Sequence, residues 1–186
     1  MGFRDGILVE LIKEAQAEYI AEIGVGKGRT TRSILRSECS AIVKEYWAVD
    51  PWSTVYSRDF RIRGTQQDVF DKRAWNVYKY MCFFPQLKIV RMPSVEAAKL
   101  FLNYERHVEG KYFDIVFIDA EHDYDNVKKD ILAWHPLIKE GGIICGHDYA
   151  SREKGVIKAV NEIYGVDNIE VIRPGSVWVK KVENNR

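Results

Sequence analysis

The chain has 186 residues, of which 46% are hydrophobic, and its formal net charge is +1. This length and composition favour a single domain with one hydrophobic core, and the balanced charge argues against a nucleic-acid or membrane partner. The apolar stretches are strand-sized and the N-terminus is charged, so neither a transmembrane helix nor a signal peptide is predicted. Cys39, Cys82 and Cys145 lack the spacing of a metal site and indicate reduced thiols in a cytoplasmic protein.

A helix and a strand open the chain. Apolar residues recur at helical spacing within residues 1–16, which predicts an N-terminal helix. Residues 19–23 form a short apolar run that predicts a strand, and a glycine-rich turn follows it directly. The next helix is expected from Thr30 to Leu35, so this segment has the pattern of a strand, a turn and a helix.

The second strand is expected at 46–49, where Asp50 and a proline stop it. Residues 53–85 are polar, aromatic and less regular, with a helix expected from about Gln66 to Phe83. We interpret this segment as a lid over the substrate, because its basic and aromatic side chains suit an anionic or sugar-like acceptor. The alternative, a helical excursion that packs on the sheet or on a partner subunit, stays open.

The third strand is expected at 87–90, and a helix at 95–104 follows it. Residues 113–118 are continuously apolar, which is typical of a central parallel strand that is covered on both faces. This run is the clearest strand signal in the chain.

The last part of the chain continues the alternation. A helix with an apolar face over 127–138 is expected to end at Gly141-Gly142. A fifth strand is predicted at 143–146, a last helix at 156–164, and a hairpin around Pro174-Gly175. Strands that alternate with helices imply an α/β fold with a parallel sheet and right-handed crossovers, and the hairpin implies one antiparallel strand at an edge.

Polar residues follow each predicted strand of this sheet. Ligands bind at the carboxyl ends of the strands in such folds, and parallel strands bring those ends to one edge. The residues in these positions are Glu22, Gly24, Gly26, Gly28, Asp50, Ser94, Asp119, Glu121, His122, His147 and Asp148. This edge of the sheet is therefore the predicted functional site.

The spacing of the glycines indicates the class of ligand. Gly24, Gly26 and Gly28 follow a G-x-G-x-G pattern, whereas a dinucleotide site requires G-x-G-x-x-G. Glu22 precedes them, where a carboxylate would repel a pyrophosphate but suits the ammonium and sulfonium of S-adenosylmethionine. Asp50 lies where a carboxylate accepts hydrogen bonds from ribose hydroxyls. The alternative, a plain tight turn with a solvated aspartate, is disfavoured by this combination of residues.

The sequence resembles class I S-adenosylmethionine-dependent methyltransferases in the segments EIGVGKG, AVDPW and FDIVFIDAEHDYDNVKKDILAWHPLIKEGGIICGHDY. The likeness spans roughly residues 17–182 and is greatest toward the small O-methyltransferase-like group of cephalosporin-hydroxylase-type and macrolide-sugar methyltransferases. Catechol O-methyltransferase is a more distant likeness. The resemblance implies a Rossmann-like, mostly parallel sheet of seven strands in the order 3-2-1-4-5-7-6, with strand seven antiparallel. It also implies S-adenosylmethionine or S-adenosylhomocysteine as the bound cofactor.

The resemblance further implies a divalent metal beside the methyl donor. Many relatives hold it with an aspartate that ends strand four and a pair of residues that ends strand five. These positions are Asp119, which is also assigned to the donor, and His147-Asp148. Oxygen ligands favour Mg²⁺, and the imidazole tilts the expected ion toward Mn²⁺ or a similar metal. In the alternative, His147 only hydrogen-bonds Asp119 and no metal binds.

His122 is the candidate general base, because it lies three residues after Asp119, where catechol O-methyltransferase-like enzymes carry a lysine. Methyl transfer to oxygen requires the hydroxyl to lose its proton, and histidine titrates close to neutral pH. In the alternative, His122 is an orienting residue that hydrogen-bonds Asp148 or the backbone. Glu121 is a second candidate for the base.

Trp52 and Ser94 are assigned to the cofactor, and each has an alternative. Trp52 follows the second strand and either stacks on the adenine or packs in the core. Ser94 either contacts the adenine edge or caps the helix that begins beside it.

Three hypotheses about function follow. The first is methyl transfer to a hydroxyl of a small molecule, with or without a metal. The second is a non-catalytic ligand-binding or interaction module on the same fold, since a fold does not determine a function. The third is an NAD-dependent oxidoreductase, which the glycine spacing and Glu22 disfavour. The short N-terminal segment further implies either an open site or, in a homo-oligomer, a site that a second subunit closes.

Overall fold

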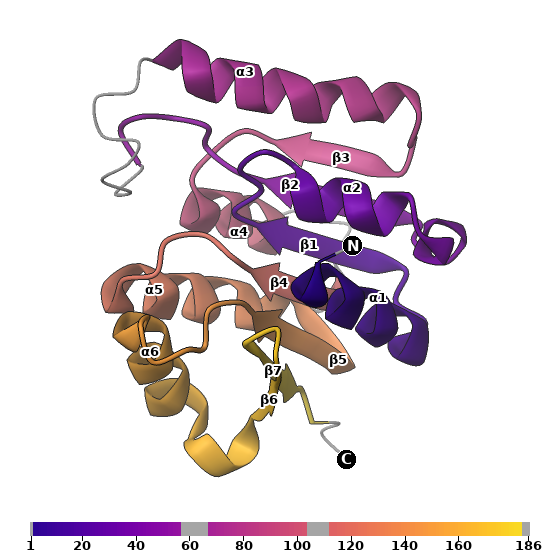
Figure 1. The fold of residues 1–186 in the computed structure, drawn as a ribbon. Coiled ribbons are helices and arrows are strands. Elements are labelled where there is room, and N and C mark those ends of the chain that lie inside the picture. The colour runs from indigo at the N-terminus through magenta and orange to yellow at the C-terminus, as the bar shows by residue number, and fades with distance from the viewer. Residues whose placement is uncertain (1, 57–66, 104–111, 184–186) are drawn as a thin grey trace.

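The computed structural model describes residues 2–56, 67–103 and 112–183. A sheet of seven strands lies between two layers of helices (Figure 1). The strands are β1 (Tyr19–Ile23), β2 (Glu45–Val49), β3 (Leu87–Val90), β4 (Phe113–Ile118), β5 (Ile138–Gly146), β6 (Glu170–Ile172) and β7 (Val177–Lys181). The helices are α1 (Phe3–Ala15), α2 (Arg29–Leu35), α3 (Gln67–Tyr78), α4 (Ser94–Asn103), α5 (Tyr124–Trp134) and α6 (Lys154–Tyr164). Short 3₁₀ helices are η1 (Glu38–Ala41), η2 (Lys79–Cys82), η4 (His135–Leu137) and η5 (Val166–Asn168).

The strand order is β3-β2-β1-β4-β5-β7-β6, which confirms the order that the resemblance implies. Strands β1 to β5 pair in parallel, and β7 runs antiparallel to both of its neighbours. From the hairpin we expected the antiparallel strand at an edge of the sheet, and this expectation was wrong. Strand β7 inserts between β5 and β6, where Trp178 lies opposite Gly146, and β6 becomes the edge strand.

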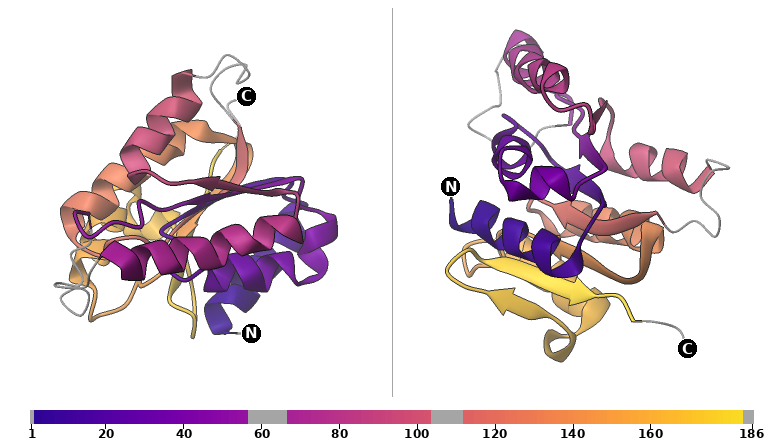
Figure 2. Two further views of the ribbon diagram at one scale, coloured as in Figure 1. Left: turned by 90° about the horizontal axis from the view of Figure 1, so that it is seen from above. Right: turned by 90° about the vertical axis from the view of Figure 1, so that its right-hand side faces the viewer.

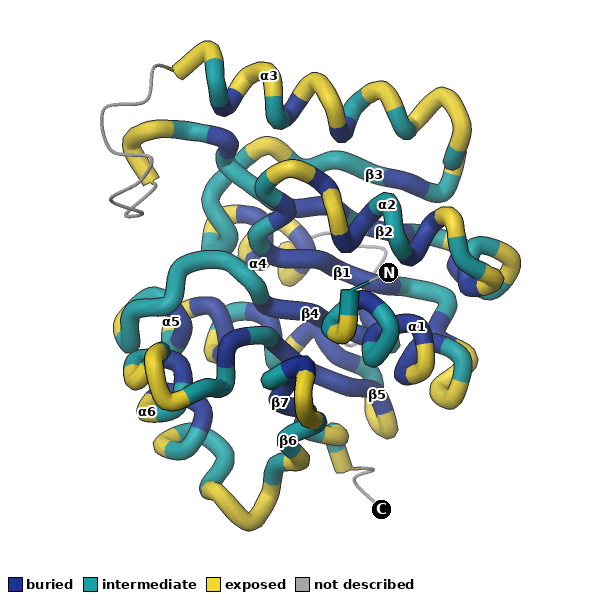
Figure 3. The backbone as a smooth tube through the Cα atoms, viewed as in Figure 1, coloured by how far each residue is buried: buried dark blue, intermediate teal, exposed yellow. Residues whose placement is uncertain are grey.

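Side chains that alternate along the central strands face two separate cores. In β4, Phe117 packs in the core formed with α1, α2 and α3, while Val116 and Ile118 pack in the core formed with α4, α5 and α6. Figure 2 shows these helical layers on opposite sides of the sheet, and Figure 3 shows the central strands buried. Because both faces are covered, β4 is apolar at nearly every position, as the sequence predicts.

The chain between α5 and β5 differs from the expectation. The predicted helix over 127–138 was to end at Gly141-Gly142, but α5 ends at Trp134, and Ile138 already pairs with Phe113 in the sheet. A Cβ on Gly142 would lie 2.9 Å from a backbone oxygen of β4. The glycines therefore allow β4 and β5 to approach closely where the register of their pairing shifts, and they do not terminate a helix.

Residues 67–82 follow the packing alternative for the segment between β2 and β3. Helix α3 buries Phe70, Ala74 and Val77 against the sheet, at the edge formed by β3 (Figure 1). The central part of the predicted lid, 57–66, lies outside the described residues. The lid over the substrate therefore stays a prediction.

None of the helices in the described ranges combines the length and the apolar composition needed to cross a bilayer. The three cysteines are free thiols; Cys39 and Cys145 are buried, and Cys82 is exposed.

Candidate functional site

The loops after β1, β2 and β4 meet at one edge of the sheet (Figure 1). The backbone N–H of Gly24 donates a hydrogen bond of 2.9 Å to the carbonyl of Val49, at the end of β2. Gly24 has a φ of +89°, which favours glycine, and a Cβ there would collide with the backbone oxygen of Asp119. The glycine turn therefore lies directly against the start of the loop that follows β4.

Asp50 fastens the glycine turn. Its carboxylate accepts hydrogen bonds from the backbone N–H of Gly26 at 2.8 Å and of Trp52 at 2.7 Å. Burial raises the pKa of Asp50, and these hydrogen bonds oppose that rise. Carboxylate oxygens can each accept a further hydrogen bond, so the predicted contact with ribose hydroxyls is compatible with this geometry.

Gly26 and Gly28 shape the turn in different ways. Both have positive φ, +55° and +69°. A Cβ on Gly26 would meet no atom within 4 Å, whereas a Cβ on Gly28 would lie 2.7 Å from the Val77 side chain. Gly28 thus lets α2 begin close to α3, and Gly26 leaves space in which a ligand can approach the backbone.

Glu22 lies in the core, on the side of β1 that faces α2. It is 1% exposed, and its Oε2 accepts hydrogen bonds from the hydroxyls of Thr31 and Tyr46. Burial raises the pKa of Glu22 to about 8, although both hydrogen bonds act in the opposite direction. Glu22 thereby ties β1 to α2 and β2, and its contact with the positive end of a donor stays a prediction.

Trp52 and Ser94 both have partners within the protein. Trp52 is 1% exposed, and its indole N–H donates a 2.7 Å hydrogen bond to the carbonyl of Gly26. This contact matches the packing alternative, with the indole bracing the glycine turn from the core. Ser94 begins α4, and its hydroxyl accepts a 2.8 Å hydrogen bond from Trp134, a contact that neither interpretation anticipated. The roles of both residues toward adenine stay predictions.

Two histidines and two aspartates meet at the ends of β4 and β5. Nδ1 of His147 lies 3.6 Å from Oδ1 of Asp119 and 3.1 Å from Oδ2 of Asp148. Nε2 of His122 lies 3.2 Å from the same oxygen of Asp148. The three residues predicted as metal ligands thus form one cluster, and His122 belongs to it as well.

The cluster favours the charged forms of its members. Burial alone would raise the pKa of Asp148, but contacts with His147 and Arg152 hold this pKa well below its usual range. Burial alone would lower the pKa of His147, yet Asp119 and Asp148 together raise it to about 9. The position between Asp119 and Asp148 therefore favours the imidazolium form of His147, and a metal bound through this ring would have to displace its proton.

Two arginines complete the cluster, and sequence reasoning missed both. Arg4, in the first turn of α1, forms an ion pair with Oδ2 of Asp119. Arg152 donates a 2.9 Å hydrogen bond to Oδ1 of Asp148. The spacing of four residues between Asp148 and Arg152 is a local signal that could have indicated their contact. Arg4 lies 115 residues from Asp119, so no local signal exists for it.

The donor atoms of the cluster fit a divalent cation, provided that their present partners move aside. Asp119, His122 and Asp148 each offer one ligand atom, and these atoms lie within 4.8 Å of one another. This set contains His122 where the sequence predicted His147. Carboxylate oxygens with an imidazole nitrogen suit Mn²⁺ and related ions. One oxygen of each carboxylate is engaged by an arginine, so a metal would have to compete with these side chains.

Glu121, the second candidate base, lies beside the cluster. Together with Asp119, His122 and His147 it lines a cavity of about 10 Å³ at the ends of β4 and β5. This is about the space that one water molecule needs. Both candidate bases therefore lie at the predicted edge, and their catalytic roles stay predictions.

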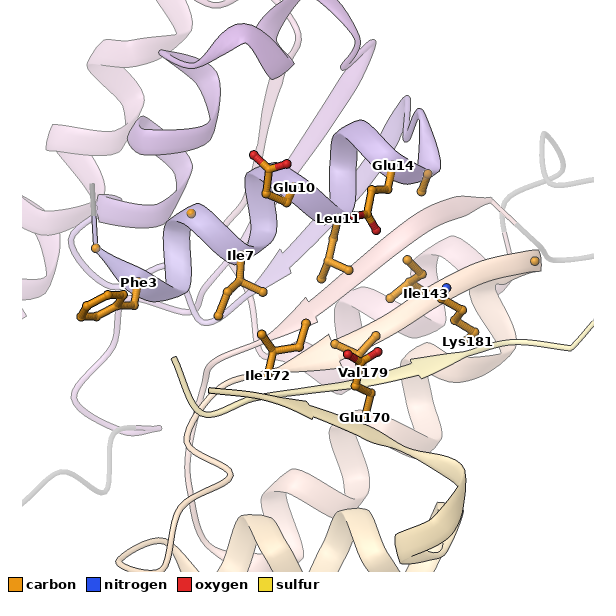
Figure 4. A pocket seen from close by; sticks show the side chains of 14 residues that line it. Phe3, Ile7, Glu10, Leu11, Glu14, Ile143, Glu170, Ile172, Val179 and Lys181 are labelled. Carbon is orange, nitrogen blue, oxygen red and sulfur yellow. The ribbon is translucent and has the colours of Figure 1, made fainter. Parts of the chain in front are cut away.

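A larger groove, of about 720 Å³, lies between α1 and the strands β5, β6 and β7 (Figure 4). Its labelled apolar side chains are Phe3, Ile7, Leu11, Ile143, Ile172 and Val179. No residue of the predicted site lines this groove. The groove and the cluster are connected through the first turn of α1, because this turn contributes Phe3 to the groove and Arg4 to the cluster.

Comparisons with known proteins bear on this arrangement. A family model described as a methyltransferase domain matches residues 21–149. Among solved structures, a candidate caffeoyl-CoA O-methyltransferase from Staphylococcus aureus is 16% identical with a TM-score of 0.67, over 99% of this chain and 84% of that chain. An O-methyltransferase from Bacillus cereus in complex with SAH is 14% identical with a TM-score of 0.61, over 98% and 82%. CalS11, a TDP-rhamnose 3'-O-methyltransferase of calicheamicin biosynthesis, is 15% identical with a TM-score of 0.61, over 95% and 78%. No curated protein matches the chain.

The family match covers more than half of the chain and includes both the glycine turn and the cluster at the ends of β4 and β5. The solved structures, at these low identities, show the fold. The chain therefore belongs to the methyltransferase domain family and has the fold of the class I S-adenosylmethionine-dependent methyltransferases.

Proposed function

We propose that the protein transfers the methyl group of S-adenosylmethionine to a hydroxyl oxygen of a small molecule. One observation carries this proposal. The glycine turn, fastened by Asp50, lies against the backbone of Asp119, whose carboxylate belongs to the cluster with His147. A donor on the turn would therefore lie beside acidic and basic side chains, which are the groups that an acceptor hydroxyl requires.

The donor would occupy the side of the turn that Gly26 leaves open. The N–H groups of Gly24 and Gly26 are paired within the protein, so their carbonyl oxygens would accept hydrogen bonds from the ammonium of its methionine part. Asp50 would accept hydrogen bonds from its ribose. Glu22 would lie on the core side of the turn. Burial keeps it protonated at neutral pH in the free protein, and the positive charge of a bound donor would favour its carboxylate form. In each of these contacts, a positively charged or hydrogen-bond-donating group of S-adenosylmethionine would meet an oxygen of the protein.

His122 would take the proton of the acceptor. Its side chain is 38% exposed, with Nε2 at 3.2 Å from Oδ2 of Asp148 and Nδ1 at 3.7 Å from Oε2 of Glu153. With Nε2 paired to Asp148, Nδ1 would receive the proton. The acceptor oxygen forms a bond to the methyl carbon, the bond from that carbon to sulfur breaks, and its electron pair stays on sulfur. The hydroxyl proton goes to Nδ1, and the products are a methyl ether and S-adenosylhomocysteine. Glu121 is the second candidate for this proton transfer.

A divalent cation, Mg²⁺ or Mn²⁺, would be held by Asp119, Asp148 and an imidazole of His147 or His122. When bound, such an ion supplies Lewis acidity that polarises an acceptor oxygen. With His122 as a ligand, Glu121 would be the base. With His147 as the ligand, His122 keeps that role.

The donor site is tested by calorimetry with S-adenosylhomocysteine. Asp50→Lys should abolish binding, because the change removes the carboxylate that holds both the turn and the ribose. Asp68→Lys, an equal change of charge on the exposed face of α3, should leave the affinity unchanged. Unchanged affinity in the Asp50 variant would show that the donor binds elsewhere.

The base is tested by turnover with a panel of phenols and sugars. His122→Gln should keep the affinity for S-adenosylhomocysteine and lower kcat by about 10²–10⁴-fold. Acceptors with acidic hydroxyls should be less sensitive, because they arrive ionised. Binding of the donor without turnover of any acceptor would favour the non-catalytic module, and stabilisation by NAD instead of the donor would favour the oxidoreductase.

The domain organisation, the lid, the cellular location and the oligomeric state are also predictions. We propose that residues 1–186 form one domain in which 53–85 include a lid, and that the protein is cytoplasmic and forms a homo-oligomer. Size-exclusion chromatography with light scattering tests the oligomeric state.

A further inference from the structure

We propose that Arg4 competes with a divalent cation for Asp119, so that the first turn of α1 must leave the cluster before a metal can load. This inference deepens the proposed function and rests on its metal site alone. It does not depend on methyl transfer itself.

Arg4 is held in place by a network that links α1 to α2. Its side chain is 20% exposed and contacts Asp119 through Nη1 and Asp5 through Nε, the latter at 3.4 Å. Asp5 is 1% exposed and accepts hydrogen bonds from Thr30 at 3.2 Å and Ser33 at 3.0 Å. The ion pair with Asp119 is thus preorganised and partly shielded from solvent, where charge interactions are screened less.

A metal at Asp119 would compete with the positive charge of Arg4 in this arrangement. Oδ2 of Asp119 is engaged by Arg4, and Oδ1 faces His147 at 3.6 Å. A cation bound between Asp119 and Asp148 would lie next to the guanidinium, and like charges at such distances repel strongly in a partly buried site. The arginine on the other carboxylate differs, because Arg152 is 73% exposed and can turn into solvent. Of the two arginines, Arg4 is therefore the one whose release limits metal binding.

The first turn of α1 borders a groove on one side and contacts the turn between β6 and β7. Gly2, Phe3, Gly6 and Ile7 line the 720 Å³ groove (Figure 4), while a Cβ on Gly175 would lie 2.3 Å from Cδ1 of Ile7 and 3.5 Å from the backbone nitrogen of Arg4. The N-cap residue Gly2 makes no side-chain capping hydrogen bond, Phe3 is 74% exposed, and glycine has a low helix propensity. The ion pairs of Arg4 and the hydrogen bonds of Asp5 are therefore the polar contacts that hold this turn. A metal that displaces Arg4 from Asp119 removes one of these contacts and weakens the turn, and by linkage a weakened turn favours the metal.

Titration of the metal-free full chain with Mn²⁺, followed by calorimetry, tests the competition. Arg4→Gln removes the competing charge and should bind Mn²⁺ about tenfold more tightly than the wild type, or better. Lys13→Gln, an equal change of charge at the far end of α1, and Arg4→Lys, which keeps the charge, should both bind like the wild type. Equal or weaker binding by Arg4→Gln, or no binding by any of the proteins, overturns the proposal.

Hydrogen exchange of the wild type tests the linkage without any substitution. The backbone amides of residues 6–8, beginning with Gly6, which donates to the carbonyl of Gly2 at 3.0 Å, should exchange faster at saturating Mn²⁺ than in its absence, whereas those of residues 11–15 should not change. Unchanged exchange of residues 6–8 at saturation overturns the proposal even if the Arg4 variants fail to fold. Binding of S-adenosylhomocysteine by the metal-free chain is measured alongside. If it persists while Mn²⁺ does not bind, the inference fails and the proposed methyl transfer stands.

Discussion

Replacing Glu22 by glutamine should change how the stability of the protein depends on pH. Glu22 is 1% exposed, and burial raises its pKa from 4.5 to about 8. Between these two values the folded protein keeps the proton, while the unfolded chain has lost it. The free energy of unfolding of the wild type therefore falls as the pH rises through this window, by about 1.4 kcal/mol per pH unit. Glutamine keeps the shape and an acceptor oxygen but has no proton to lose.

Urea unfolding of both proteins at about pH 5.5 and about pH 7.5 measures this difference. Over these two pH units, the wild type should lose about 2.7 kcal/mol of stability relative to Glu22→Gln. Other titrating groups change in both proteins alike, so they cancel in the comparison. Glu14→Gln, at an exposed position of α1, should show no such pH-dependent difference.

A stability difference between the wild type and Glu22→Gln that stays constant across this pH range would refute the reasoning. It would mean that Glu22 ionises in the folded protein as it does in the unfolded chain, despite its burial. The same measurement with saturating S-adenosylhomocysteine tests the donor site. If the ammonium of the ligand lies near Glu22, it favours the carboxylate, and the pH dependence of the wild type should flatten.

Three further substitutions test the turn, the core and a helix start. Gly24→Ala should abolish binding of S-adenosylhomocysteine in calorimetry, because a Cβ would collide with the backbone after β4 and the φ of +89° disfavours a side chain; full affinity would contradict the assignment of the turn. Ile131→Ala, at a position that is 0% exposed, should lower the free energy of unfolding in urea by about 2–5 kcal/mol, whereas exposed Leu132→Ala should change it little. Asp123→Ala should lower the free energy of unfolding by about 1 kcal/mol in the same assay, because the carboxylate of Asp123 caps α5 by accepting a 3.2 Å hydrogen bond from the backbone N–H of Asn126. An unchanged free energy of unfolding would contradict this cap.

Much of the fold could be predicted because its signals are local. The apolar runs at 19–23 and 113–118 coincide with β1 and β4, since a strand buried on both faces requires apolar residues at successive positions. The run at 87–90 coincides with β3, at the edge of the sheet. The glycines of the turn and the polar residues after the strands follow from the same pattern. Parallel strands bring their carboxyl ends to one edge, so Asp119 and His147 could be placed together from the sequence.

Local pattern failed where strand pairing or packing decided the outcome. Ile138 continues the apolar face of a helix, yet its pairing with Phe113 places it in β5. In this case a contact with another segment outweighs the preference of the residue's own neighbours. For Trp52 the sequence left core packing and adenine stacking open, and the structure adds a hydrogen bond from its indole to the carbonyl of Gly26, in another segment.

By itself, the sequence determined the alternation of strands and helices, the glycine turn and the edge at which the polar residues gather. Only the tertiary structure decided the partners of those residues, such as Arg4 for Asp119 and Thr31 for Glu22. The physical reason is that backbone conformation responds to neighbours in the chain, whereas burial and ion pairing depend on segments that the fold brings together from far apart. The charge state of the cluster therefore depends on the whole fold. The N-terminal helix contributes the cation Arg4, which no local sequence motif predicts.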